Sequence, residues 1–241
     1  MLTEEVAKRT QLRWRISSTW PGNSPVIAVG TEASLRAVAR VHVDELGAQP
    51  AVPGAEGYRI RVSQQGGTPM ALVVGNDPRG VLFGIGKLLR SLRMEKGSAR
   101  LPADLKITTA PKYPVRGHQL GNRTLNNSAD AWKAPMWEQY FRDLAVFGAN
   151  SVELLPPQAN GWEDSPHSPL PLLEMMGECS RILAEYGMDV WIWFPALAKD
   201  YSDPATVASE LKDWARVFEK LPHIDADFVP GATRATPIQN T

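Results

Sequence analysis

The feature that most constrains the fold is an alternation of strand and helix patterns in residues 115–229. Predicted strands at 115–120, 150–154, 188–194 and 224–229 alternate with predicted helices at about 136–147, 170–186 and 204–219. Gly148 and Gly187 directly follow the first two helices, as expected for helix C-terminal stops. Strands that alternate with helices of this length form parallel βαβ units, so we expect an α/β fold with a parallel sheet.

The part of the chain before this alternation has a different pattern. It predicts helices at 3–10, after the cap residue Thr31 and from Pro78 onward, with Asp77 as the N-cap of the last, and strands at 25–30, 58–62 and 71–75. Alternating Leu12, Trp14 and Ile16 predict one more strand. This pattern is typical of a small α+β domain.

Prolines at 111 and 114 separate the two patterns and favour an extended linker. We therefore predict an α+β domain at 1–110 and a partial TIM-type barrel at 111–231. Its four βα units are half of the eight in a complete (β/α)8 barrel. The small, polar residues 232–241 have no periodicity, which predicts a disordered or foreign tail. Long loops follow the first three strands, where α/β barrels carry their chemistry.

Charge and composition exclude several function classes. The chain has 26 basic and 26 acidic residues, so we expect neither nucleic acid nor an anionic membrane surface as a partner. No apolar run approaches the roughly 20 residues of a membrane span, and the charged start predicts no export signal. Eight tryptophans and 20 prolines in a neutral chain favour a surface that stacks on flat ligands such as sugar rings.

No motif in the sequence indicates a metal or a cofactor. The four histidines have no i, i+4 spacing, so we expect no zinc site. Gly84–Lys87 lies inside a predicted helix and not in a phosphate loop. The turn at 75–78 can hold an anion, but a helix cap by Asp77 is the favoured interpretation. Cys179, the single cysteine, is expected to be a buried structural thiol.

Three segments of the sequence carry a resemblance to a known class of enzyme. Residues 111–117 (PKYPVRG), 147–154 (FGANSVEL) and 79–89 (RGVLFGIGKLL) resemble glycoside hydrolases of the β-N-acetylhexosaminidase and α-glucuronidase type. In that class a non-catalytic α+β domain precedes a (β/α)8 barrel. The resemblance implies hydrolysis of a terminal sugar, and it implies that Arg116 binds hydroxyls of that sugar. A pairing of Arg116 with a carboxylate under the barrel is the alternative.

The sequence departs from this class where the chemistry is expected. The resemblance implies a catalytic Asp-Glu pair at the end of the fourth strand, but no carboxylate follows Asp227 in this chain. The strand ends that do carry chemistry-bearing residues give other candidates. We predict Glu153, Asp130 and Asp200 as available catalytic carboxylates, or alternatively as solvated loop acids and partners of Arg116 and Arg123.

Three tryptophans near the predicted strand ends are candidates for stacking on a sugar. Trp132 and Trp162 lie in predicted loops, and Trp193 lies near the end of the third strand. Trp191 is expected in the core, because both faces of a strand in a parallel barrel are buried.

The sequence therefore predicts a glycoside hydrolase, or a part of one, that acts on a terminal sugar of an oligo- or polysaccharide. The alternative is a non-catalytic carbohydrate-binding fragment without the acid/base carboxylates, and a different activity on a rebuilt site is a third hypothesis. A half barrel has open strand edges, so we also expect a homo-oligomer that forms through them.

Overall fold

The computed structural model describes residues 1–22, 24–44, 54–65, 67–120, 131–154, 169–194, 196, 198 and 200–229 of the 241. The chain divides into two compact units: Met1–Pro114 with Arg142–Gly148, and Val115–Phe141 with Ala149–Thr241.

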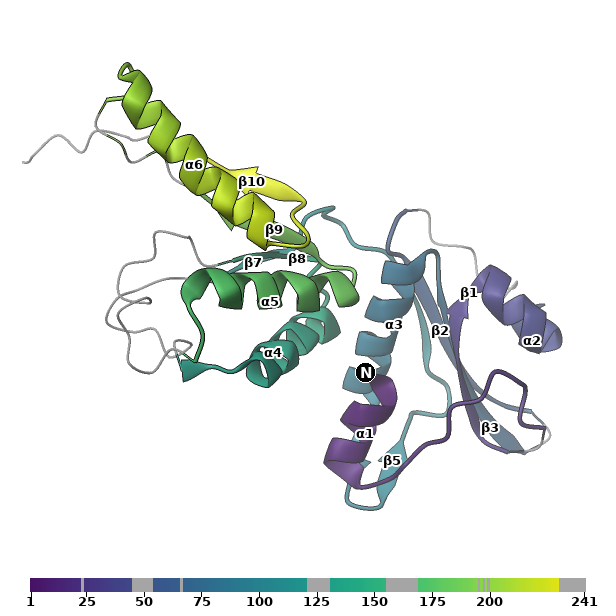
Figure 1. The fold of residues 1–241 in the computed structure, drawn as a ribbon. Coiled ribbons are helices and arrows are strands. Elements are labelled where there is room, and N and C mark those ends of the chain that lie inside the picture. The colour runs from purple at the N-terminus through teal and green to yellow at the C-terminus, as the bar shows by residue number, and fades with distance from the viewer. Residues whose placement is uncertain are drawn as a thin grey trace, which may run out of the picture. The chain divides into compact units, whose positions relative to one another are not determined.

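The first unit is built around a mixed four-stranded sheet in the order β1-β3-β2-β6. β1 is parallel to β3, whereas β2 is antiparallel to β3 and β6. The first unit also contains a two-stranded antiparallel sheet of β4 and β5. The elements, shown in Figure 1, are α1 (Leu2–Thr10), β1 (Val26–Thr31), α2 (Glu32–Asp44), β2 (Tyr58–Gln65), β3 (Thr68–Gly75), α3 (Pro78–Ser91), β4 (Arg93–Glu95), β5 (Ser98–Arg100) and β6 (Lys106–Thr109).

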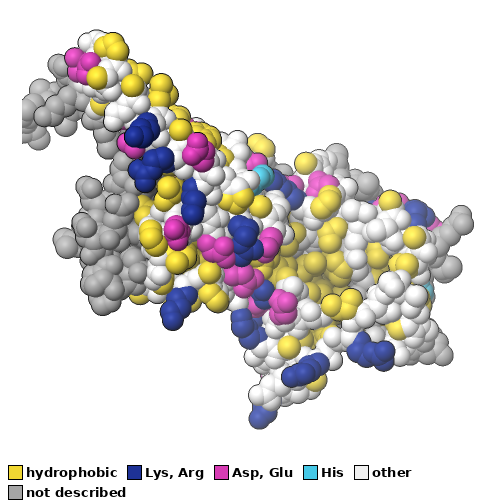
Figure 2. Space-filling model, in the orientation of Figure 1, with side chains coloured by type: hydrophobic (Ala, Val, Ile, Leu, Met, Phe, Trp, Pro, Cys, Tyr) yellow, Lys and Arg dark blue, Asp and Glu magenta, His cyan; other side chains and the backbone are white. Residues whose placement is uncertain are grey.

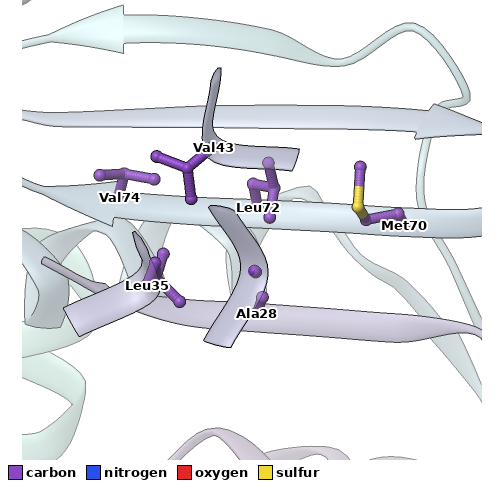
Figure 3. Close-up of a cluster of buried hydrophobic side chains, with 7 residues drawn as sticks. Ala28, Leu35, Val43, Met70, Leu72 and Val74 are labelled. Carbon is purple, nitrogen blue, oxygen red and sulfur yellow. The ribbon is translucent and has the colours of Figure 1, made fainter. Parts of the chain in front are cut away.

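Helices cover both faces of this sheet, because successive side chains of a strand point to opposite faces. Leu72 of β3 packs in a cluster with Leu35 and Val43 of α2 (Figure 3). The next residue, Val73, packs in a second cluster with Phe83 and Leu88 of α3. The alternation along one strand thus places α2 on one face and α3 on the other.

The strand expected at Leu12, Trp14 and Ile16 is wrong. No strand is formed between Gln11 and Ser17, and the side chain of Ile16 is 85% exposed. Leu12 and Trp14 pack against a cluster of Val6, Leu89 and Leu92. The alternation marks an extended segment that packs on one side but is not paired with another strand.

The second unit contains four parallel strands in the order β10-β9-β8-β7. A helix joins each strand to the next, which confirms the alternation predicted from the sequence. The elements are β7 (Gly117–Gln119), α4 (Ala134–Phe147), β8 (Ser151–Glu153), α5 (Leu172–Glu185), β9 (Asp189–Trp193), α6 (Pro204–Lys220) and β10 (Ala226–Phe228) (Figure 1). The C-terminal part of α4 is counted with the first unit.

The burial of α6 differs from the sequence prediction. The spacing of its apolar residues 207, 211, 214 and 218 predicts that these residues form one buried stripe. Leu211 is 62% exposed and Phe218 is 47% exposed, and Val217 is buried instead. Trp214 lies between Phe194 and Phe218, with ring centroids 4.6 and 6.2 Å away. Hydrophobic side chains are visible at the surface over α6 in Figure 2. The stripe is only partly buried because, in the part of the chain that the structure describes, no βα unit follows β10.

None of the described helices is long and apolar enough to cross a membrane.

Candidate functional site

The two faces of the parallel sheet in the second unit have different environments. Along β9, Val190 and Ile192 are fully buried, whereas Asp189, Trp191 and Trp193 are half-buried. The buried face is covered by the helices. Tyr140 of α4 lies 2.7 Å from Nε2 of His118, and Phe194 packs on Trp214 of α6. The opposite face corresponds to the inside of a barrel, and we call it the inner face.

One row of the inner face combines an amide, a carboxylate and an indole. Gln119 is in register with Glu153, and Glu153 is in register with Trp191. Neighbouring residues in a parallel sheet point to the same face, about 4.8 Å apart. Nε2 of Gln119 donates a hydrogen bond to Oε1 of Glu153 over 2.8 Å. Gln119 and Glu153 are the last residues of β7 and β8, so this row lies where α/β barrels carry their active sites.

A second row of the inner face is aromatic. Trp193, the last residue of β9, is in register with Phe228, the last residue of β10. Phe228 is 51% exposed and Trp193 is half-buried. Together with Trp191, these side chains form an apolar surface beside Glu153. An arrangement of one carboxylate next to flat apolar groups can bind a ring that has both hydroxyls and a C–H face.

The structure places Trp191 on this inner face and not in the core, which corrects the expectation from the sequence. That expectation assumed a complete barrel whose interior is filled by side chains from all eight strands. With four strands in the described chain, the inner face is not enclosed.

Arg116 lies at the other end of the sheet, where the strands begin. Its backbone N–H donates to Oδ1 of Asn150 over 2.8 Å, and its carbonyl oxygen accepts from the backbone N–H of Asn150 over 3.1 Å. Arg116 is therefore level with Asn150, three residues before Glu153. At about 3.3 Å per residue, this separates the Arg116 backbone from the Glu153 row by about 10 Å along the strand.

Trp132 belongs to an aromatic cluster at the start of α4. Its ring centroid lies 4.9 Å from that of Trp137 and 5.3 Å from that of Tyr140, both in edge-to-face geometry. Trp137 is buried and Trp132 is half-buried. Trp132 therefore packs against the start of α4, whether or not it also contacts a ligand.

Asp200 forms a local turn before α6. Its Oδ1 accepts hydrogen bonds from the backbone N–H and the hydroxyl of Ser202, over 2.8 and 2.6 Å. These bonds lower the pKa of Asp200, so the carboxylate is ionised at neutral pH and is not a proton donor there. Two further candidates, Asp130 and Trp162, lie outside the described residues.

The fourth strand carries its carboxylates away from the inner face. Asp227 is in register with the buried Ile192, which places it on the helix-covered face. Burial raises the pKa of Asp227, although a hydrogen bond from the backbone of Phe228 opposes this effect. Asp225 accepts a hydrogen bond from the backbone N–H of Val190 over 2.7 Å and lies 2.8 Å from Nε2 of His223. These contacts indicate a structural role for Asp225.

Two other features of the described residues do not form ligand sites. A small cavity between the sheet and helices α4 and α5 is lined by apolar groups alone, which indicates a packing gap; its residues are Leu120, Trp137, Leu154, Leu172, Met175, Met176 and Cys179. Within the described ranges, no cluster of three or more His, Cys, Asp or Glu side chains is arranged to hold a metal ion.

Gln119 and Phe228 are not among the site residues that the sequence predicts. Gln119 carries no charge, and its partner Glu153 is 34 positions away in the chain. The signal that identifies both is strand register, which depends on how the four strands pair.

Comparisons with known proteins give a fold but no family. No family model and no curated protein matches the sequence. Among solved structures, CpGH84B matches with a TM-score of 0.57 and 16% identity, over 80% of this chain and 33% of that chain. CpGH84D matches with a TM-score of 0.58 and 14% identity, over 95% of this chain and 38% of that chain.

A third structure is an inactive mutant of a GH20 exo-β-N-acetylglucosaminidase from Vibrio harveyi. It matches with a TM-score of 0.50 and 10% identity, over 81% of this chain and 30% of that chain. The chain thus spans about a third of the length of these structures. At such identities the likeness concerns the fold. It confirms an α/β fold of the glycoside hydrolase type, in which a small α+β domain is followed by a partial TIM-type barrel.

Proposed function

We propose that the chain forms part of a glycoside hydrolase that acts on a terminal sugar of an oligo- or polysaccharide. In this proposal residues 1–110 are a non-catalytic α+β domain, and residues 111–231 are the first four βα units of a barrel. The observation that carries the proposal is the position of Glu153. This carboxylate lies at the C-terminal end of a parallel strand, beside Gln119 and Trp191, in a fold like those of glycoside hydrolases.

The proposed site consists of Glu153 with Trp193 as an aromatic wall. Arg116 is included because of the sequence resemblance. It would bind sugar hydroxyls from the N-terminal end of the strands. Asp130 and Trp162 are proposed as contributions from the loops after β7 and β8. Asp200 contributes less to this proposal, because Ser202 already engages its carboxylate.

A non-catalytic sugar-binding function is the second candidate, and one observation favours it. Glycoside hydrolysis generally requires two carboxylates that flank the scissile bond. Among the described strand residues, Glu153 is the single carboxylate at the C-terminal end of the inner face. One carboxylate with aromatic neighbours is sufficient to bind a sugar but not to hydrolyse it by this mechanism.

A panel of p-nitrophenyl glycosides tests the two candidates, with the β-N-acetylglucosaminide and the α-glucuronide as its first members. Hydrolysis by the wild type that is lost in Glu153→Gln and Arg116→Ala supports the hydrolase. Sugar binding without hydrolysis supports the binding function. Hydrolysis that survives both substitutions contradicts the site, and absence of both binding and hydrolysis contradicts both functions.

We also propose that the chain associates with a second copy through the edges of its parallel sheet. β7 and β10 are the outer strands of this sheet, and Phe228 and Val229 at one edge are 51% and 46% exposed. β10 of one copy beside β7 of another would extend the sheet with every strand parallel. Light scattering at micromolar concentration tests this proposal: we expect a dimer, and a stable monomer contradicts it.

A further inference from the structure

We propose that Gln119 is a positioning residue that orients the carboxylate of Glu153 as an acceptor for ligand hydroxyl groups. The inference deepens the proposed function and rests on it, because it assigns a role within the same site. It applies to both candidate functions, since a sugar must be oriented whether or not it is hydrolysed.

The geometry of the pair is fixed by the backbone. The residues Gln119 and Glu153 are in register in adjacent parallel strands, so their side chains leave the sheet side by side. The hydrogen bond runs from Nε2 of Gln119 to Oε1 of Glu153 over 2.8 Å. This hydrogen bond engages Oε1 of the carboxylate and does not involve Oε2.

The chemistry of the pair favours hydrogen bonds from ligand hydroxyl groups to Glu153. A glutamine side chain does not ionise, so its amide N–H remains a hydrogen-bond donor to Glu153 at every pH. An ionised carboxylate accepts hydrogen bonds that are shorter and roughly twice as strong as those between neutral groups. Glu153 can therefore accept from a sugar hydroxyl while Gln119 keeps its orientation constant.

The third member of the row supplies the other half of sugar recognition. Trp191 follows Glu153 in register, on the side opposite Gln119, and it is half-buried on the inner face. A sugar ring has hydroxyls at its edge and C–H groups on its face. Glu153 would accept hydrogen bonds from the hydroxyls at the edge of the ring, and Trp191 would stack on its C–H face. The expected ligand is therefore a hydroxyl-rich ring.

Two substitutions at position 119 test this role. Gln119→Met has a similar length but cannot donate a hydrogen bond, whereas Gln119→Lys keeps a donor for Glu153. Gln119 is exposed, so both variants should keep the fold, which thermal unfolding checks. A packing role would be served by methionine as well as by lysine, so the pair separates positioning from packing.

The first measurement uses the full chain without ligand. We expect the side-chain amide resonance of Gln119 in a ¹H–¹⁵N spectrum to be shifted downfield. This shift should be lost in Glu153→Ala and kept in the control Asp200→Asn. An amide resonance that does not respond to Glu153→Ala overturns the positioning role, whatever ligand the protein binds.

The second measurement uses tryptophan fluorescence during titration with the methyl β-glycosides of N-acetylglucosamine, glucose and galactose and with methyl α-glucuronide. We expect Gln119→Met to weaken binding about tenfold and Gln119→Lys to bind within about threefold of the wild type. Equal affinities in the two variants overturn the inference while the proposed function stands. If the wild type binds none of these sugars, the proposed function fails and the assignment of a sugar as ligand fails with it. The amide measurement then still decides the contact between Gln119 and Glu153.

Discussion

Asp77 holds the start of α3 through its contact with Gly80. Oδ1 of Asp77 accepts a hydrogen bond from the backbone N–H of Gly80 over 2.7 Å, and Oδ2 accepts from the backbone N–H of Glu56 over 2.6 Å. One carboxylate thus caps a helix and fastens a segment 21 residues earlier in the chain. The cap confirms the interpretation favoured by the sequence over an anion site at this turn.

Asp77→Ala should therefore destabilise the first unit by about 2 kcal/mol, at the upper end of the range for a helix cap. Both backbone donors lose their acceptor in this variant. The control is Asp203→Ala, which removes the cap of the exposed helix α6 and should cost about 1 kcal/mol or less. Denaturant unfolding of both variants measures the difference, and equal losses would show that the second contact adds nothing.

Gly75→Ala should destabilise the protein more than any cap variant, by at least about 3 kcal/mol. A Cβ at this position would lie 2.2 Å from the backbone nitrogen of Val81 and 2.6 Å from the carbonyl carbon of Gly80. Both are backbone atoms of α3, which cannot move without displacing the helix. Gly67→Ala is the comparison, because its φ is +84° but nothing lies within 4 Å. It should cost about 1–2 kcal/mol, and a larger loss there than at Gly75 would contradict the steric argument.

Glu5→Gln should make the stability of the first unit less dependent on pH. The side chain of Glu5 is 2% exposed, and burial by itself raises its pKa. Hydrogen bonds from Arg9 and Arg142 outweigh burial, so the pKa lies below the ordinary 4.5. A lowered pKa in the folded state means that the carboxylate stabilises the protein above about pH 4.5. This contribution is lost as the pH falls through the folded-state pKa.

At pH 7, Glu5→Gln should lower the free energy of unfolding by about 2 kcal/mol, with a smaller difference from wild type at pH 3. Glu4→Gln is the matched control, since Glu4 also contacts Arg142 but is 61% exposed. Such an exposed pair contributes about 0–1 kcal/mol. Urea unfolding at several pH values measures both variants, and a loss that is equal at pH 3 and pH 7 argues against the ionised pair.

Asp227→Asn should stabilise the protein slightly above pH 4 and have no effect below. Oδ1 of Asp227 has no hydrogen-bond partner within the described ranges, and burial raises the pKa of this carboxyl above 3.8. A raised pKa in the folded state means that stability is greatest in the protonated form and falls as the pH rises through the folded-state pKa. The amide removes this loss because it does not ionise.

The control for this prediction is Asp225→Asn on the same segment. Asp225 accepts from the backbone of Val190 and pairs with His223, so its substitution should destabilise the protein at pH 6. Thermal unfolding between pH 3 and pH 8 compares the two variants. A destabilised Asp227→Asn at pH 7 would mean that Oδ1 of the carboxylate has a partner.

Cys179 should not react with a thiol reagent such as DTNB while the protein is folded. Its side chain is 3% exposed, and burial raises the pKa of the thiol well above its ordinary range. The thiolate, which is the reactive form, is therefore scarce at pH 8. We expect reaction on the order of 100-fold slower than in guanidinium, where one thiol per chain should react. Rapid reaction of the native protein would contradict the structural role that the sequence also predicts.

The periodicity of the sequence was sufficient to predict the order of the elements. Helices α3, α4, α5 and α6 and strands β8, β9 and β10 begin and end close to the predicted positions, because their apolar spacing, prolines and glycines act within a few residues. The failures were the segment at Leu12–Ile16, the buried face of α6 and the core position of Trp191. In each, the local pattern was regular, but the described residues hold no strand or helix in the place of the expected partner.

The carboxylate Glu153 was selected from the sequence, because the end of a predicted strand is a local property. Its neighbours Gln119 and Trp191 could not be selected in the same way, since they lie 34 and 38 positions away and become neighbours only through strand register. The sequence by itself determined which residues form strands and helices and which of them are apolar. The tertiary structure decided which side chains share one face and how exposed that face is, because hydrogen bonds between distant strands, and not local propensity, set the register.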